Sequence, residues 1–243
     1  MSHGTSRVAL SLLASVALLA VTGAATHAQD KPLAAGWQED FGVGTCKMLT
    51  SGRNDYFVLE PGYTLVLQEG DTRMEIKVLD ETRDVAGVTT RVVEEREWDK
   101  GKLHEVSRNY YAICESTKDV IHFGEDVQHL VDGKVVKTEG TWIAGVNGNR
   151  PGLVIAGKPK LNYKYYQEIA PGVSMNRGEI VSLSETCKSP AGIFIKCMKV
   201  RGTSTMDAKK LEYKYYAPNI GLVQDQNLRL VKYGGAKPSP HVK

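Results

Sequence analysis

The stretch GVTTRVVEEREWDKGKLHEVSRNYYAI, residues 87–113, contains two strand-like segments rich in β-branched and aromatic residues. Lys100-Gly101 lies between them and favours a two-residue turn. Such a turn predicts three cross-strand pairs: Trp98 with Leu103, Glu97 with His104, and Arg96 with Glu105. The charged pairs are worth roughly a few tenths of a kcal/mol each. The stretch therefore predicts an antiparallel hairpin without invoking any chemistry.

The same organisation continues on both sides of this hairpin. Upstream, Met74, Ile76 and Val78 alternate with charged residues, which is the period of a half-buried strand. Downstream, Asp132-Gly133 is a strong hairpin motif between two further strand-like segments. No segment has convincing helical periodicity with caps. We expect an all-β fold with little helix, an antiparallel meander that forms a curved half-barrel, a barrel or a sandwich.

The N-terminus has the pattern of an export signal. Arg7 precedes an apolar stretch, residues 8–21, and Thr26-His27-Ala28 ends in the small residues that suit a signal peptidase. We expect a signal peptide over residues 1–28, an N-terminal extension over 29–54, a single antiparallel β domain over 55–234 and a disordered tail over 235–243. The protein would be periplasmic or secreted by the bacterial general secretory route, with no transmembrane anchor after cleavage.

The charge balance and the motifs exclude several classes of function. The chain has 31 basic and 28 acidic residues, interleaved along the sequence, so no nucleic-acid partner is expected. Residues 152–159, GLVIAGKP, have the glycine and lysine spacing of a phosphate loop but end in proline where serine or threonine is required. No nucleophile elbow is present. We expect no catalytic residues and no cofactor, and we favour a non-catalytic role while the sequence leaves enzyme activity and the oligomeric state open.

The four cysteines predict two disulfides, because an even number in an exported protein favours pairing. Cys187 and Cys197 flank a turn at 190–192 and would face each other on a hairpin. By elimination, Cys46 would pair with Cys114.

The segment IHFGEDVQHL, residues 121–130, is a candidate metal site. With a tight turn at Gly124-Glu125, His122 and His129 would lie diagonally on one face, and Asp126 could add a carboxylate. Imidazole with carboxylate suits a divalent transition metal such as zinc, copper or nickel. The alternative is a polar hairpin with acidic residues at its turn.

Tyrosines suggest a ligand-binding face. Tyr163 and Tyr165 share one strand face and Tyr213 and Tyr215 share another, with their apolar bodies and polar tips suited to a wet cavity. Trp142, before a glycine-rich loop, is a further candidate. The lysines between these tyrosines, Lys164 and Lys214, would point to solvent.

These observations lead to a first hypothesis and three alternatives. The first is an exported, non-catalytic binding module or carrier for an apolar or amphipathic ligand, with a cavity larger than ~300 Å³. The second is a periplasmic metal-binding protein that uses His122 and His129. The third is an envelope structural or interaction protein. The fourth is a hydrolase with paired carboxylates, for which the candidate acid–base cluster is Glu94, Glu95, Glu97 and His104.

Three motifs carry a resemblance to a known family: GVTTRVVEEREW at 87–98, HFGEDV at 122–127 and YKYYAPNIGLVQD at 213–225. The chain resembles a family of exported bacterial all-β proteins of unassigned function, over Tyr56 to Tyr233. The resemblance implies export and an all-β fold, and it implies no activity. In that family an aromatic residue is usual where His122 stands, and histidine is not usual where His129 stands. The resemblance therefore implies that a metal site would be particular to this chain.

Overall fold

The computed structural model describes residues 36–235. The predicted signal peptide and residues 236–243 of the predicted tail lie outside this range. The described residues form strands and loops, and one short 3-10 turn, η1 (Val43–Thr45), is their only helical element. None of the described residues forms a helix long and apolar enough to cross a membrane.

The strands of the described region follow one another along the chain with short connections. They are β1 (Met48–Leu49), β2 (Gly52–Asn54), β3 (Phe57–Leu59), β4 (Thr64–Glu69), β5 (Thr72–Val85), β6 (Val88–Asp99), β7 (Lys102–Cys114), β8 (Val120–Val131), β9 (Lys134–Lys137), β10 (Trp142–Ile143), β11 (Gly152–Ile155), β12 (Lys164–Tyr166), β13 (Asn176–Ser189), β14 (Gly192–Ser204), β15 (Glu212–Ala217), β16 (Gly221–Asp225) and β17 (Leu228–Gly234).

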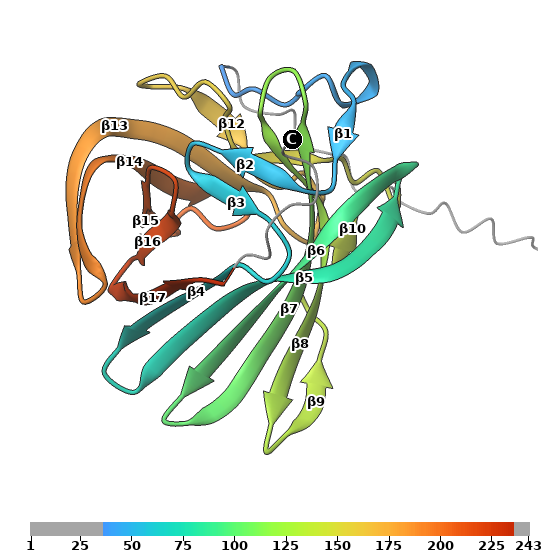
Figure 1. Cartoon of the computed structure of the whole chain (residues 1–243). Coiled ribbons are helices and arrows are strands. Elements are labelled where there is room, and N and C mark those ends of the chain that lie inside the picture. The colour runs from blue at the N-terminus through green and yellow to red at the C-terminus, as the bar shows by residue number, and fades with distance from the viewer. Residues whose placement is uncertain (1–35, 236–243) are drawn as a thin grey trace, which may run out of the picture. The chain divides into compact units, whose positions relative to one another are not determined.

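Most of these strands belong to one antiparallel sheet of 15 strands, which confirms the predicted meander (Figure 1). The order is β10-β8-β7-β6-β5-β4-β17-β16-β15-β14-β13-β12, with β1, β9 and β11 attached to the side of β7 or β8. Two runs of consecutive strands, β4–β8 and β12–β17, are joined where β4 pairs with β17. The sheet does not close into a barrel.

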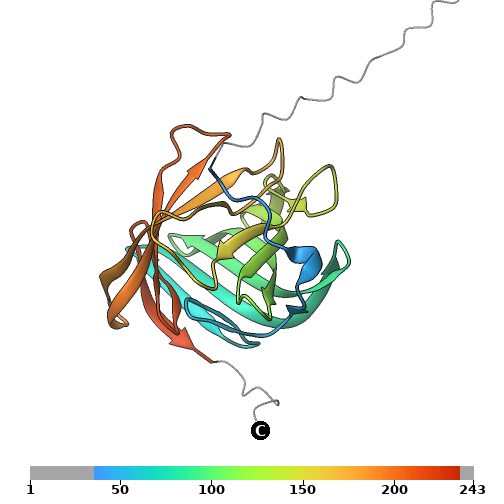
Figure 2. The same ribbon diagram turned by 90° about the horizontal axis from the view of Figure 1, so that it is seen from above.

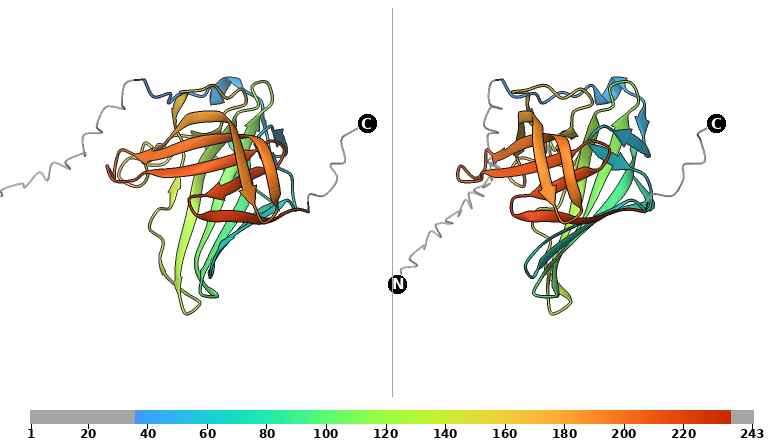
Figure 3. Two further views of the ribbon diagram at one scale, coloured as in Figure 1. Left: turned by 90° about the vertical axis from the view of Figure 1, so that its left-hand side faces the viewer. Right: turned by 60° about the vertical axis from the view of Figure 1, so that its left-hand side comes forward.

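The two runs of strands curl towards each other. Seen from above, the sheet bends round so that its two ends face one another (Figure 2). Strands β13–β17 cross steeply in front of the long strands β5–β8 (Figure 3). Apolar residues from both runs are buried together between them, among them Leu67, Val93, Phe123, Ile180 and Met198. The core therefore lies inside the curl.

Turn chemistry explains the hairpins. Ala86-Gly87, Lys100-Gly101 and Asp132-Gly133 all have positive φ at both residues, with values of 50° and 79°, 49° and 76°, and 49° and 77°. This is the mirror-image turn that matches the twist of a β-hairpin. The hairpin predicted at Asp132-Gly133 is confirmed, because Val131 pairs with Lys134.

The predicted register of the β6–β7 hairpin is right at the turn and wrong beyond it. Trp98 pairs with Leu103 as predicted. A bulge then intervenes, because β7 has one more residue than β6 between this pair and the next. Glu97 consequently pairs with Glu105 instead of His104, and Arg96 with Val106 instead of Glu105.

The turn predicted at Gly124-Glu125 is wrong, because β8 continues through it. Gly124 lies at an irregularity, where β8 has one more residue than β7 between two successive pairs. Its φ is 141°, and a Cβ there would lie 2.5 Å from the carbonyl oxygen of Trp142 on β10. Glycine therefore lets β8 bend without a turn while β10 packs closely against it.

Both predicted cysteine pairs are present. Cys46 and Cys114 are 5.7 Å apart between Cα atoms, and their bridge ties the segment before β1 to β7. Cys187 and Cys197 are 6.3 Å apart and connect β13 with β14. They are not directly opposite, since a bulge places Glu185 across from Cys197. Two disulfides are typical of a protein in an oxidising compartment.

Candidate functional site

A cavity of about 220 Å³ lies inside the curl of the sheet, between the two runs of strands. It is smaller than the ~300 Å³ expected from the sequence. It shares Glu95, Glu212 and Lys214 with a wider, more open hollow of about 490 Å³. We call the first space the inner cavity and the second the mouth.

One wall of the inner cavity is apolar. Alternate residues of β5 and β6 supply Ile76, Val78 and Val93, because residues two apart in a strand share a face. Strands β3, β4, β11 and β16 and the turn before β16 complete this wall with Phe57, Val58, Leu65, Val154, Leu222 and Ile220. An apolar wall of this kind favours the alkyl or aromatic part of a ligand.

Three tyrosines add polar tips to the inner cavity: Tyr63, Tyr111 and Tyr216. The Tyr63 hydroxyl donates a hydrogen bond to the Ile220 carbonyl, 2.9 Å away. Tyr111 packs edge-on against Phe57, with ring centroids 5.5 Å apart. These rings line the space with π-faces as well as aliphatic surface.

The side of the cavity towards the mouth is acidic. Glu95 and Glu97 follow Val93 on the inner face of β6, and Glu97 lies directly opposite Glu105 on β7. On the next strand, Glu125 pairs with Asn109, which lines the cavity. The cavity and mouth together are lined by six acidic residues, Glu69, Glu95, Glu97, Glu168, Glu212 and Asp225, and two lysines, Lys210 and Lys214.

Burial and mutual repulsion hold protons on this cluster. Burial raises the pKa of Glu95 to about 8, with Glu97 and Asp225 adding to the effect and Lys214 opposing it. Burial likewise raises the pKa of Glu125 to about 8, and the nearby Glu168 raises it further. The pKa of Glu97 is also raised, by burial first and then by Glu105. At neutral pH Glu95 and Glu125 are therefore mostly protonated.

Lys214 is the cation of the cluster. Its ammonium lies 3.0 Å from Asp225. Burial lowers the pKa of Lys214, but Asp225 first, and then Tyr216, Glu212 and Glu95, outweigh burial and hold that pKa well above its usual range. Lys214 is therefore charged at any physiological pH. The other carboxylate oxygen of Asp225, Oδ1, is buried and has no hydrogen-bond partner among the described residues.

His122 is a neutral residue of the cavity wall. It is only 2% exposed, between Tyr111 and Trp142, whose ring centroids are 4.8 Å and 5.0 Å away. Burial lowers its pKa to about 4, against the opposing effect of Glu168, 3.9 Å from its Nδ1. Its Nε2 has no hydrogen-bond partner in the described part of the chain.

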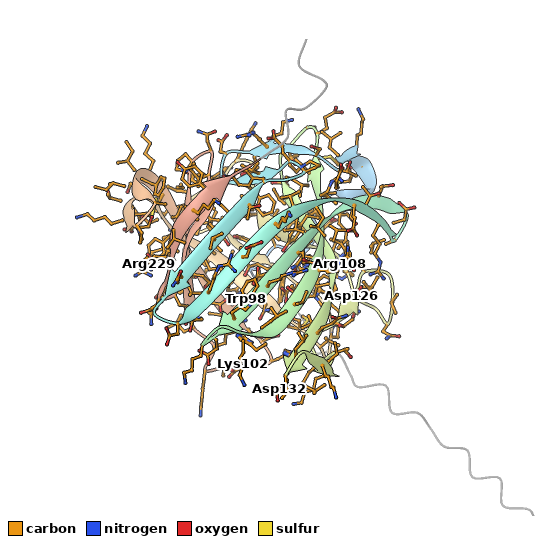
Figure 4. The ribbon with its side chains drawn as sticks, turned by 60° about the horizontal axis from the view of Figure 1, so that its bottom comes forward. Trp98, Lys102, Arg108, Asp126, Asp132 and Arg229 are labelled. Carbon is orange, nitrogen blue, oxygen red and sulfur yellow. A yellow bond between two sulfur atoms is a disulfide. The ribbon has the colours of Figure 1, made fainter. Side chains whose placement is uncertain are left out.

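The structure does not bring the predicted metal ligands together. His129 lies 3.2 Å from Glu105. Asp126 accepts hydrogen bonds from Tyr110 and Arg83, and it lies beside Arg108 on the face of β7 and β8 turned to the viewer in Figure 4. Residues 36–235 contain no group of three or more His, Cys, Asp or Glu side chains that could hold a metal ion.

The predicted tyrosine set does not line the cavity either. Tyr165 is fully buried in the core and packs against Tyr163 at 5.5 Å. Tyr213 and Tyr215 pack on the side chain of Lys199, 4.4 Å and 5.2 Å from its ammonium, while Trp142 is buried beside His122.

The residues of β15 that do line the cavity alternate with these tyrosines: Glu212, Lys214 and Tyr216. Lys214, expected on the solvated face, is thus on the cavity side, whereas Lys164 is 42% exposed and lies 4.0 Å from Glu179. The sequence shows that these residues alternate along the strand, but it does not show which face of the strand turns towards the cavity.

The candidate acid–base cluster is only partly assembled. Glu95 and Glu97 both face the mouth, and His104 lies 3.8 Å from Glu97. Glu94 instead pairs with Arg96, 2.7 Å away. Glu105, Glu125 and Glu168, which the sequence did not single out, join the cluster from neighbouring strands and loops.

Comparison with known proteins adds little to this geometry. No family model and no curated protein matches the chain. A crystal structure described as that of a "putative lipoprotein" from Parabacteroides distasonis ATCC 8503 aligns with 76% of this chain and 100% of its own, at 14% identity and a TM-score of 0.37. A likeness this low carries neither fold nor function to this chain.

Proposed function

We propose that this protein is an exported, non-catalytic binding module that holds an apolar or amphipathic molecule inside its curled sheet. The observation that supports this most directly is the inner cavity, with an apolar wall on one side and charged groups towards the mouth. Export is supported by the two disulfides and by the pattern of residues 1–28.

The division of the cavity suggests how a ligand would lie. Ile76, Val93 and Leu222 offer apolar surface, and each methylene transferred from water to such a wall contributes about 0.8 kcal/mol. A polar group on the same ligand would stay among Glu95, Lys214 and the water of the mouth. An amphipathic molecule fits both requirements.

The cavity also favours binding over a purely structural role in the envelope. A structural domain gains stability from a filled core, because empty space forfeits packing contacts. Here the two halves of the sheet leave about 220 Å³ between them instead of closing on each other.

The proposal can be tested with the environment-sensitive dye N-phenyl-1-naphthylamine, a neutral amphipathic probe. We expect saturable fluorescence enhancement with the wild-type protein and its loss in Ile76→Trp, which places a bulky ring in the cavity wall. Ile193→Trp is the matched control, since Ile193 is 70% exposed and lines no part of the cavity. Leu222→Phe is a milder second variant if Ile76→Trp does not fold. Unchanged binding in both cavity variants, or equal loss in the control, would contradict the proposal.

A further inference from the structure

We propose that the ligand is an amphiphile with a cationic ammonium head, which sits among the carboxylates and aromatic rings of the cavity. This inference rests on the proposed function and names its ligand class.

The first argument is the excess of acidic groups. Both lysines of the site are already engaged, Lys214 with Asp225 at 3.0 Å and Lys210 with Glu212 at 3.8 Å. Glu95 also faces the mouth, and among residues 36–235 Lys214 acts on it without forming an ion-pair contact. A cation from outside would supply the missing counter-charge.

The second argument is an electrostatic repulsion between two neighbouring strands, β6 and β7. Glu97 and Glu105 are directly opposite each other on adjacent strands, an arrangement of like charges that destabilises a sheet. Two histidines lie near them, His104 at 3.8 Å from Glu97 and His129 at 3.2 Å from Glu105. A bound cation would relieve the repulsion between the two carboxylates.

The third argument is an unpartnered acceptor. Asp225 is only 8% exposed and lines the mouth, and its Oδ1 has no hydrogen-bond partner among residues 36–235. A carboxylate oxygen can only accept hydrogen bonds when ionised, so the partner it lacks is a donor or a positive charge. An ammonium head would supply that positive charge.

The fourth argument separates an organic cation from a metal ion. Four aromatic side chains line the inner cavity: Phe57, Tyr63, Tyr111 and Tyr216. Aromatic faces attract ammonium groups, and cages of such rings recognise quaternary ammonium ligands. The apolar wall would take the alkyl chain, whereas the described residues offer no cluster suited to a metal ion.

Proton displacement follows from the state of the carboxylates. Burial raises the pKa of Glu95, which lines both the inner cavity and the mouth, to about 8, so an incoming cation meets a protonated group at neutral pH; the pKa of Glu125 on the neighbouring strand β8 is also raised to about 8. The titratable and charged groups around them are Glu97 on β6, Glu105 on β7, His122 on β8, Glu168 before β13, Glu212 and Lys214 on β15, and Asp225 on β16. A cation lowers the pKa of these acids, so affinity should rise with pH up to about 8 and level off above it.

The test is isothermal titration calorimetry of the full mature protein with three probes of equal chain length: decyltrimethylammonium, decanol and decanoate. The first carries a permanent charge, so only the protein titrates. We expect decyltrimethylammonium to bind at least about tenfold more tightly than decanoate. Its Kd should fall between pH 6 and pH 8, by about tenfold per pH unit for each proton released. Titrations at pH 7 in two buffers of different ionisation enthalpy count those protons directly.

Glu95→Gln should weaken decyltrimethylammonium binding by about tenfold and flatten its pH dependence, and its circular dichroism spectrum should match that of the wild type as a test of folding. Glu94→Gln, on the opposite face of the same strand, is the matched control and should behave as wild type. Equal or tighter binding of decanoate, or binding of the ammonium probe without proton release, would overturn this inference and leave the proposed function standing. Failure of all three probes to bind would overturn both.

Discussion

Replacing Glu95 by glutamine should stabilise the protein at alkaline pH and have no effect at acid pH. In the folded protein, burial raises the pKa of Glu95 to about 8, whereas an unperturbed glutamate titrates near 4.5. Below pH 4.5 the side chain is neutral in both the folded and the unfolded states. Between pH 4.5 and pH 8 only the unfolded state ionises, so stability falls as the pH rises.

The size of the effect follows from these two pKa values. They differ by about 3.5, and each unit is worth about 1.36 kcal/mol, so an ionised Glu95 costs the folded state about 5 kcal/mol above pH 8. Glutamine has nearly the same shape and never ionises, so Glu95→Gln should recover most of that free energy at pH 9.

The assay is urea unfolding of the mature, oxidised wild-type and Glu95→Gln proteins at intervals from pH 4 to pH 9. We expect the two free energies of unfolding to coincide at pH 4 and to diverge steadily up to pH 8, with the variant the more stable. Parallel pH profiles, or a variant that is less stable at pH 9, would show that Glu95 is not the buried carboxylate described above. Glu94→Gln should follow the wild type throughout.

Three other substitutions probe the same structure. The wild type should lose up to about 3 kcal/mol of stability as the pH falls from 6.5 to 4, because the pKa of buried His122 is lowered to about 4 and the residue stays neutral while the unfolded state takes up a proton. His122→Phe should remove this loss. Urea unfolding below pH 6.5 measures it, and identical acid profiles for the two proteins would contradict the prediction. Gly124→Ala should lower the free energy of unfolding by more than about 2 kcal/mol, because the new Cβ would meet the Trp142 carbonyl. Gly70→Ala, with open space around it, should lower it by about 1 kcal/mol. Similar melting temperatures for the two variants would refute the close packing of β10. Replacing Cys46 and Cys114 by alanine should lower the free energy of unfolding by about 4 kcal/mol, because it removes a disulfide between residues that are 68 positions apart. A change below about 1 kcal/mol in denaturant unfolding would show that the bridge does not constrain the unfolded chain.

Much of the local structure was predictable from the sequence. The alternation of Met74, Ile76 and Val78 identifies a strand and the face it buries, and the structure places all three inside. Turn residues located the hairpins, because only certain residues adopt positive φ at low cost. The number and spacing of the cysteines indicated the pairing that the structure contains.

The cavity was not predictable, for two physical reasons. First, bulges such as those at His104 and Gly124 change the register by one residue, and a one-residue change moves side chains to the other face. Second, both faces of some strands carry apolar and charged residues together. On β6, Val93 and Glu95 face inward, but Val92 and Glu94 on the other face have the same composition. On β15 both alternations contain tyrosine. Which face is enclosed depends on how the two runs of strands, joined where β4 pairs with β17, curl towards each other.

The position of a bound ligand tests the central claim most directly. We would label the methyl groups of isoleucine, leucine and valine and measure nuclear Overhauser effects to unlabelled decyltrimethylammonium in the complex. The account predicts contacts from the alkyl chain to Ile76, Val93 and Leu222 in the inner cavity. Contacts confined to exposed methyl groups, such as those of Val135 and Ile193, would contradict it, because they would place the ligand on the outside of the sheet.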